Sequence, residues 1–351
     1  MKYFYLFSLA ALLVAVRPAT AQVDSVMAST LPPAQEAEKF YNSGISKFSG
    51  KEYTLAVADF SKALELKNDF DLAYYNRGLT FYELKDYPKA LADLNKALEF
   101  NAANAKALFS LAQVKYATND KAGAAANYSK AIAADATYAP SYYYRGGIFF
   151  EEENYKKAIE DFDKAITLDP KYAYAYNDRG SAKRQLNDYN GAIADYSKAL
   201  SLEPKLAFAY NNRGSAKRKS GDIKGAIADY TIALTLQKNS YLAYNNRGSA
   251  RFDAGEYQDA VADFSEALKL KPDYAFALIN RAAAKFKLKD YKGAADDCTK
   301  AIALDANSAS AYLNRGIAHE MLRQDAKACA DFKKAAELGL ETAKSYTQGC
   351  K

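Results

Sequence analysis

AFAYNNRGSAKRKSGDIKGAIADYTIALTLQKNS, residues 207–240, is followed directly by YLAYNNRGSARFDAGEYQDAVADFSEALKLKPDY, residues 241–274. The two stretches have 34 residues each and align without a gap. Both contain AYNNRGSA near the start and, near the middle, an Ala-Asp pair followed by an aromatic residue. Self-similarity at a fixed period of this length indicates a chain built from stacked copies of one structural element.

The same period extends over most of the chain. Nine consecutive repeats, numbered 1 to 9, cover residues 37–342 without insertion or deletion. They start at Ala37, Asp71, Ala105, Ala139, Ala173, Ala207, Tyr241, Ala275 and Ala309. Position 8 of every repeat is glycine or alanine, and positions 20 and 27 are always alanine. Small side chains at these places let two helices approach closely, while a bulky residue at position 24, such as Phe264, fills the space beside them.

Two further positions complete the pattern. Position 4 is aromatic or leucine in every repeat, and position 32 is proline at Pro170, Pro204 and Pro272. With the small residues in the same order, the sequence resembles the tetratricopeptide-repeat family. The resemblance implies an all-α fold, a right-handed superhelical α-solenoid of nine helix-turn-helix repeats, with helix A at positions 2–14 and helix B at positions 18–31. It also implies that helices A line a concave groove that holds the ligand.

The two ends of the chain differ from the repeats. Residues 1–21 have the pattern of a secretory signal peptide, with a basic residue, a short apolar stretch and small residues before an expected cleavage after Ala21. This predicts export to the periplasm or the cell exterior; an uncleaved membrane anchor is the alternative. Residues 22–36 read as a disordered tether, and residues 343–351 as a C-terminal capping helix over the end of the stack.

Composition argues against several functions. The net charge of +6 is small for 351 residues, so it does not favour a polyanionic partner. The chain has one histidine and three cysteines without metal-ligand spacing, so we expect neither metal nor cofactor. Acidic residues recur at repeated positions, and no pair stands out as an acid and a base. We therefore expect no enzyme, and we expect a protein or extended peptide as the partner.

Position 6 of helix A carries a recurrent polar side chain. It is asparagine in six repeats, at Asn42, Asn76, Asn212, Asn246, Asn280 and Asn314. Amide side chains offer two donors and an acceptor, which suits the backbone of an extended peptide. The alternative is that these amides bridge neighbouring helices.

Position 5 changes character along the chain. It is aromatic in the first four repeats, at Tyr41, Tyr75, Phe109 and Tyr143, and asparagine in the next three. This predicts a groove that is aromatic near its N-terminal end and small and polar in the middle. Inter-repeat packing is the alternative for these rings.

A basic stripe follows the middle repeats and consists of Lys183, Arg184, Lys217, Arg218, Lys219, Arg251, Lys285 and Lys287. It could receive an acidic peptide or an anionic glycan, so a glycan-associated or peptidoglycan-associated structural protein is the second function considered. A solvated helix face is the simpler interpretation. Base-stacking aromatic residues are not interleaved with the stripe, and we expect no nucleic acid.

One pairing of side chains is predicted within the repeats. Seven repeats have both an arginine at position 7 and an aspartate at position 23. They include Arg77 with Asp93, Arg213 with Asp229 and Arg247 with Asp263. Their joint occurrence predicts ion pairs between helices A and B, although arginines facing a ligand are an alternative. Repeat 1, with Ser43 and Asp59, does not fit.

The cysteines have different expected roles. Cys298 occupies the bulky position 24 and is expected to be a core thiol. Cys329 lies on the last helix B and Cys350 in the tail, so the capping of the stack would bring them together as a disulfide. His319 is expected to be a packed side chain and not a catalytic one.

Overall fold

The computed structural model describes residues 32–350, and within that range the chain is made of α-helices joined by short turns. It divides into two compact units, one ending at Ala175 and the other beginning at Tyr176. We call the described part of the first, residues 32–175, the N-terminal unit, and residues 176–350 the C-terminal unit. The predicted signal peptide and most of the predicted tether lie outside the described residues.

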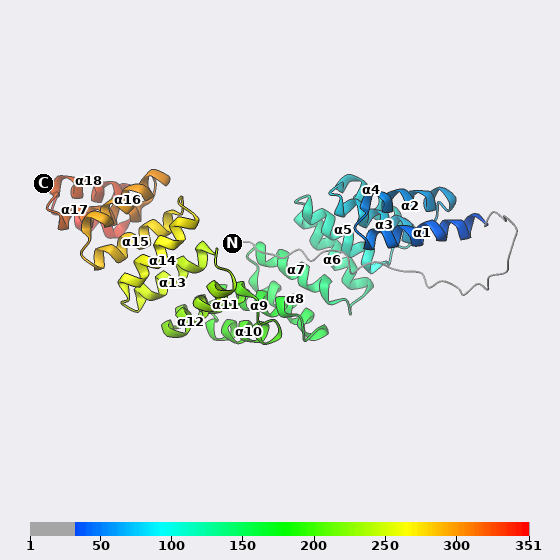
Figure 1. The fold of residues 1–351 in the computed structure, drawn as a ribbon, viewed down its shortest axis with the longest axis horizontal. Coiled ribbons are helices and arrows are strands. Elements are labelled where there is room, and N and C mark those ends of the chain that lie inside the picture. The colour runs from blue at the N-terminus through cyan, green and yellow to red at the C-terminus, as the bar shows by residue number, and fades with distance from the viewer. Residues whose placement is uncertain (1–31, 351) are drawn as a thin grey trace. The chain divides into compact units, whose positions relative to one another are not determined.

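Consecutive helices of the N-terminal unit pack side by side as antiparallel pairs (Figure 1). They are α1 (Pro33–Ser49), α2 (Tyr53–Leu66), α3 (Asp71–Glu83), α4 (Tyr87–Phe100), α5 (Ala105–Ala117), α6 (Lys121–Ala134), α7 (Ala139–Glu151) and α8 (Tyr155–Leu168). Odd-numbered helices are helices A of the repeats, and even-numbered helices are helices B.

The C-terminal unit continues the alternation, and the unit boundary falls within the first turn of α9. Its helices are α9 (Ala173–Gln185), α10 (Tyr189–Leu202), α11 (Ala207–Ser220), α12 (Ile223–Leu236), α13 (Tyr241–Asp253), α14 (Tyr257–Leu270), α15 (Ala275–Lys287), α16 (Tyr291–Leu304), α17 (Ala309–Met321), α18 (Asp325–Glu337) and α19 (Glu341–Thr347). The expected all-helical repeat fold is therefore confirmed.

Turn chemistry sets where the helices begin and end. Position 16 is often an acidic or amide N-cap; the side chain of Asp222, for example, accepts the backbone N–H of Gly225 at 2.9 Å. Position 15, just before it, has a positive φ in every repeat, as at Gly221 (φ 93°) and Lys85 (φ 60°). These two residues reverse the chain so tightly that most helices begin and end one residue earlier than predicted.

The first helix starts earlier than the tether prediction allowed. α1 begins at Pro33, so residues 33–36, assigned to the tether, are helical. Proline is well suited to the first turn of a helix because its missing N–H would have no partner there and its φ is already helical.

Close approach of the paired helices defines the core. The aromatic ring or leucine at position 24 lies directly against the residue at position 8 in both units. A methyl group built on Gly44 would meet the Phe60 ring at 2.6 Å, and one built on Gly248 would meet Phe264 at 2.8 Å. The small residues at position 8 are thus required by packing.

None of the helices in residues 32–350 is long and apolar enough to cross a membrane.

Candidate functional site

The aromatic rings at position 5 form part of the core of the N-terminal unit. Tyr41, Tyr75, Phe109 and Tyr143 are each between 0% and 2% exposed. The Tyr143 ring centroid lies 5.9 Å from that of Phe162 and 4.7 Å from that of Tyr172, so rings at positions 5, 24 and 34 pack together. Their expected role in lining a ligand groove is corrected: a ligand cannot reach them, and they hold neighbouring helices together.

The asparagines at position 6 connect successive repeats. In the C-terminal unit, Nδ2 of each donates to the position-5 asparagine of the preceding repeat: Asn212 to Asn177 at 3.2 Å, Asn246 to Asn211 at 3.0 Å and Asn280 to Asn245 at 3.0 Å. These amides therefore bridge neighbouring helices A, which was the alternative to ligand contact. The three donating asparagines are half-buried, so one side of the ladder still faces outward.

The remaining position-6 asparagines have different surroundings. Asn76 is fully buried and donates to the Tyr41 hydroxyl at 2.7 Å. Burial raises the pKa of that hydroxyl well above its usual range, and the bond from Asn76 opposes the increase. Asn42 is exposed in the first repeat, and Asn314 follows a repeat whose position 5 is the apolar Ile279. Asn76 is thus inaccessible to a ligand.

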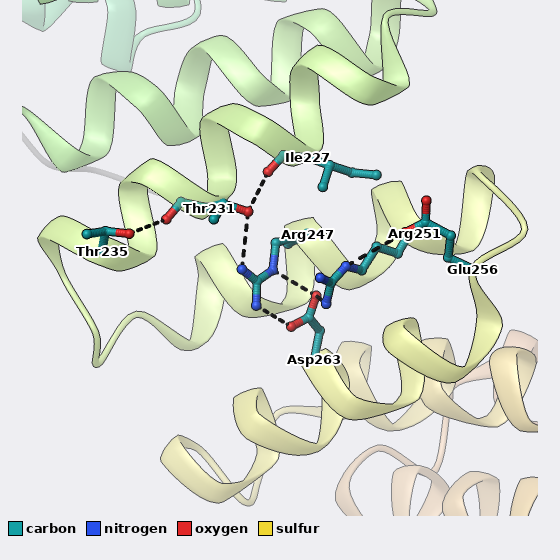
Figure 2. Close-up of polar contacts among 7 residues, drawn as sticks. All are labelled: Ile227, Thr231, Thr235, Arg247, Arg251, Glu256 and Asp263. Atoms are coloured by element: carbon teal, nitrogen blue, oxygen red, sulfur yellow. Dashed lines mark hydrogen bonds and ion pairs between the residues drawn. The ribbon is translucent and has the colours of Figure 1, made fainter.

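The arginines at position 7 form a repeated network with position 23. Arg247 donates from Nε and Nη2 to both carboxylate oxygens of Asp263, at 2.9 and 2.7 Å (Figure 2). Its Nη1 reaches the Thr231 hydroxyl of the preceding repeat at 3.2 Å, and its guanidinium lies 5.7 Å from the centre of the Tyr244 ring. Arg247 therefore joins the two helices of its own repeat to helix B of the repeat before it.

The other two predicted pairs have the same geometry. Arg77 binds Asp93 through Nε at 2.7 Å and Nη2 at 2.9 Å. Arg213 binds Asp229 through the same two nitrogens at 2.8 and 2.7 Å. Both aspartates are buried, so these arginines are occupied within the fold and do not face a ligand.

A second cation joins the network in the C-terminal unit, one helical turn after the arginine. Position 11 supplies it: Lys217 lies 2.9 Å from Asp229, Arg251 2.8 Å from Asp263 and Lys285 2.7 Å from Asp297. The predicted basic stripe thus consists largely of internal ion pairs. The sequence analysis did not predict these ion pairs. The pattern that indicates them is a second cation four residues after the arginine, in repeats that also have the aspartate at position 23.

The pKa values of Asp161, which has one cationic partner, and Asp297, which has two, are shifted in opposite directions. Burial alone raises an aspartate pKa because the interior disfavours charge. Asp161, with Arg145 as its partner, keeps a raised pKa. At Asp297, burial acts in the same direction, but the bonds from Arg281 and Lys285 together outweigh it and the pKa is lowered.

Repeat 1, which did not fit the predicted pairing, uses position 11 instead. Asp59 lies 2.6 Å from Lys47, so the lysine replaces the missing arginine. In repeat 3, where position 23 is Asn127, the amide donates to the backbone carbonyl of Gly123 at 2.7 Å.

A hollow of about 200 Å³ lies on the helix-A side of the C-terminal unit. Its lining comes from three successive helices A and one helix B: Arg218, Ser249, Phe252, Asp253, Phe264, Asn280 and Ala283. Positions 6, 9 and 12 therefore supply most of it. We call the surface formed by these positions on α9, α11, α13 and α15 the helix-A face. Of the predicted groove residues, Arg218 and Asn280 line the hollow, and Arg218 is bound to Asp253 at 2.6 Å.

The cysteines and the histidine lie away from this face. Cys329 and Cys350 form a disulfide with Cα atoms 5.5 Å apart, which ties the tail to α18. Burial raises the pKa of the free thiol of Cys298 to about 12. Burial lowers the pKa of His319, whose Nε2 lies 3.9 Å from Asp331. Within residues 32–350, no group of three or more His, Cys, Asp or Glu side chains is placed to hold a metal ion.

Family models of the tetratricopeptide repeat match residues 72–104, 139–172 and 241–274. Related models of the same repeat match residues 44–85 and 180–217, and residues 209–240. The chain belongs to the tetratricopeptide-repeat family. Membership of this family supports a role for the chain as a protein-interaction scaffold. A search of curated proteins found no match.

Several solved tetratricopeptide-repeat and related structures share the fold. The C-terminal part of a tetratricopeptide-repeat protein from Cytophaga hutchinsonii is 20% identical, with a TM-score of 0.56, over 68% of this chain and 98% of that one. A tetratricopeptide-repeat protein from Parabacteroides merdae is 19% identical, with a TM-score of 0.54, over 73% and 98%. Pseudomonas aeruginosa PilF is 20% identical, with a TM-score of 0.53, over 59% and 94%. At these identities the likeness concerns the fold alone.

Proposed function

We propose that this scaffold is non-enzymatic and binds an extended protein segment on the helix-A face of its C-terminal unit. The hollow lined by Ser249, Asn280 and Ala283 is the observation that carries the proposal. It is bordered by both polar and apolar side chains, and it has room for a side chain of a bound peptide.

The asparagine ladder supports the same face. Asn246 donates to Asn211 of the preceding repeat, and Asn280 donates to Asn245 and, at 3.5 Å, to Ser249. An amide side chain has a second N–H and a carbonyl oxygen that can accept, so hydrogen-bonding capacity remains for a peptide backbone. The bridges also fix the orientation of the amides before a ligand arrives, which lowers the entropy lost on binding.

The cell envelope is the proposed location. The signal-peptide pattern of residues 1–21 supports export, and a disulfide between Cys329 and Cys350 persists in an oxidising compartment. Cell fractionation with an antibody against the C-terminal unit would test this, and a cytosolic product of full length would contradict it.

An anionic glycan is the second candidate ligand. Exposed lysines on the helix-A side, such as Lys219 and Lys287, favour it. However, most cations of the predicted stripe are bound to aspartates, so a continuous positive surface is not formed.

The binding experiment uses a substitution, Ala283→Phe, that fills the hollow without removing a hydrogen bond between repeats. Peptides selected from a random library against the wild-type chain are measured by fluorescence anisotropy with the Ala283→Phe variant. We expect at least about tenfold weaker binding, because the new ring occupies the space that a peptide side chain would use. The matched control is Ala303→Phe on the exposed side of α16, and circular dichroism checks that both variants fold.

Two outcomes would contradict the proposal. One is a selection that enriches no peptide. The other is equal binding by the wild-type chain and Ala283→Phe, which would place any ligand elsewhere.

A further inference from the structure

A contact between successive helices A recurs in both units, joining position 12 of one repeat to position 13 of the next. In the N-terminal unit the Tyr116 hydroxyl donates to Glu151 at 2.8 Å. In the C-terminal unit Nε of Arg218 donates to Asp253 at 2.6 Å. Both pairs are 35 residues apart in the sequence, so stacking of the repeats places position 13 as the acceptor for position 12.

The same place between repeats 5 and 6 holds two cations. Position 12 is Arg184 and position 13 of the next repeat is Lys219, where the neighbouring joint has Asp253. Within residues 32–350, neither Arg184 nor Lys219 lies within ion-pair distance of a carboxylate. The adjacent lysines differ, because Lys183 is bound to Asp195 at 2.8 Å and Lys217 to Asp229 at 2.9 Å.

The surroundings of Arg184 place it beside buried hydroxyl groups. Burial raises the pKa of the Tyr196 hydroxyl, and the nearby charge of Arg184 opposes the increase. Burial raises the pKa of Tyr230 to about 12, and the nearby charges of Arg218 and Arg184 oppose the increase. Nε of Arg184 is shielded from solvent and has no hydrogen-bond acceptor in the described residues. A guanidinium in this state lacks the planar acceptor that its geometry favours.

We propose that Arg184 and Lys219 bind the carboxylate of an acidic side chain in a peptide held on the helix-A face. The inference rests on the proposed function and names the class of peptide. The carboxylate would occupy the role that Asp253 has at the next joint, where the acceptor belongs to the protein itself.

The local charge distribution favours a peptide over an anionic polymer. The neighbouring cations Lys183, Lys217 and Arg218 are bound to aspartates, so among the cations at positions 11 to 13 of repeats 5 to 7 only Arg184 and Lys219 lack an acidic partner in the described residues. A polymer with a charge on every unit gains most from a continuous row of cations. A single acidic side chain matches a single unpaired site.

The test uses fluorescein-labelled oligoglutamate and oligoglutamine of equal length as probes. The main variant, Lys219→Asp, gives Arg184 the same partner that Arg218 has. We expect oligoglutamate to bind the wild-type chain more tightly than oligoglutamine, and Lys219→Asp to lose about tenfold in affinity for oligoglutamate alone. Lys219→Gln removes one cation without adding a carboxylate and should fall between the two.

Two further variants sharpen the test. Lys224→Asp makes the same charge change on exposed α12 and should alter the affinity by less than about twofold. Asp253→Lys releases Arg218 and recreates the like-charged pair one repeat later, so it should increase the affinity for oligoglutamate several-fold. Higher salt should weaken oligoglutamate binding more than oligoglutamine binding.

The outcomes separate this inference from the proposed function. Equal affinities for the two probes, or a Lys219→Asp variant that binds oligoglutamate as the wild type does, would overturn the carboxylate site. Library peptides that still lose binding in Ala283→Phe would then leave the peptide-binding function intact. Tighter binding of hyaluronate oligosaccharides than of oligoglutamate of equal charge would overturn the assignment to a peptide.

Discussion

The two compact units use the same repeat position to join neighbouring helices, but with different chemistry. Position 5 is a buried ring in the N-terminal unit, as at Tyr75. In repeats 5 to 7 of the C-terminal unit it is an asparagine that accepts a hydrogen bond from the next repeat, as Asn211 does from Asn246. Rings fill volume and exclude ligands, whereas amides join the helices and retain hydrogen-bonding capacity. Neighbouring repeats are therefore joined by ring packing in one unit and, in repeats 5 to 7 of the other, by hydrogen bonds between half-buried amides.

The ionic network also differs between the units, in the number of cations bound to the buried aspartate at position 23. The buried Asp93 is bound to one cation, Arg77, and the side chain one turn later in helix A is Phe81. The buried Asp263 is bound to two cations, Arg247 and Arg251. Compared with repeats 2 and 4, repeats 5 to 7 therefore replace an aromatic ring by a neutral amide at position 5 and by a cation at position 11.

The largest expected effect concerns position 5. Replacing Tyr75 by alanine should lower the free energy of unfolding by about 4 kcal/mol, because it empties a fully buried site. Asn211→Ala, the matched change in the C-terminal unit, should cost about 1 kcal/mol, the size of one hydrogen bond between neutral groups. Urea unfolding followed by circular dichroism would measure both, and equal losses would remove the distinction between the units.

The second prediction concerns position 23. Asp263→Ala should destabilise the chain by about 3 kcal/mol, because it leaves two partly buried cations without their acceptor. Asp93→Ala leaves one arginine and should cost about 2 kcal/mol. Hydrogen exchange of α13 with α14, and of α3 with α4, would report each loss locally. A greater loss at Asp93 would show that the second cation adds no stability.

The smallest effect is a difference in acid sensitivity, for which only the direction is predicted. The pKa of Asp161 is raised, so its contribution favours the folded state below the unfolded pKa and is lost as pH rises through the folded pKa. The pKa of Asp297 is lowered, so its contribution is present above the unfolded pKa and is lost as pH falls through the folded pKa. Acidification below about pH 4 should therefore open α15 and α16 before α7 and α8.

Hydrogen exchange at a series of acidic pH values would check this order. Asp297→Asn is the control, since a side chain that does not titrate should remove the acid sensitivity of α15 and α16. Opening of α7 and α8 first would contradict the assigned signs.

The fold could be predicted from the sequence because the residues that specify each helix pair lie within one repeat of 34 residues. Alanines at positions 20 and 27, the small residue at position 8 and the ring at position 24 are set within one repeat, and they specified the helix pair. The arginine and aspartate of positions 7 and 23 lie in the same repeat, and their joint presence led to the pairing. The pairing of Lys47 with Asp59 was not predicted, because position 7 was taken as the only source of a cation for the aspartate at position 23.

The candidate site was harder to predict because accessibility depends on the neighbours. Tyr143 and Asn212 both lie on helices A, at positions that the family resemblance assigns to the groove. Only the packed structure shows that Tyr143 is buried against two rings and that Asn212 is half-exposed. Sequence alone likewise joined Lys217 and Lys219 in one stripe, although only Lys217 is bound to an aspartate.

The sequence by itself determined the number of repeats, the helix pair of each and the residues that let the two helices approach. These features depend on side-chain size and charge at fixed spacing, and the amino-acid sequence specifies both. The tertiary structure decided which polar groups remain available, since contacts between residues 35 apart, such as Arg218 with Asp253, form only when repeats stack. Stacking supplies Asp253 as the partner of Arg218, whereas the residue at the corresponding position for Arg184 is another cation, Lys219.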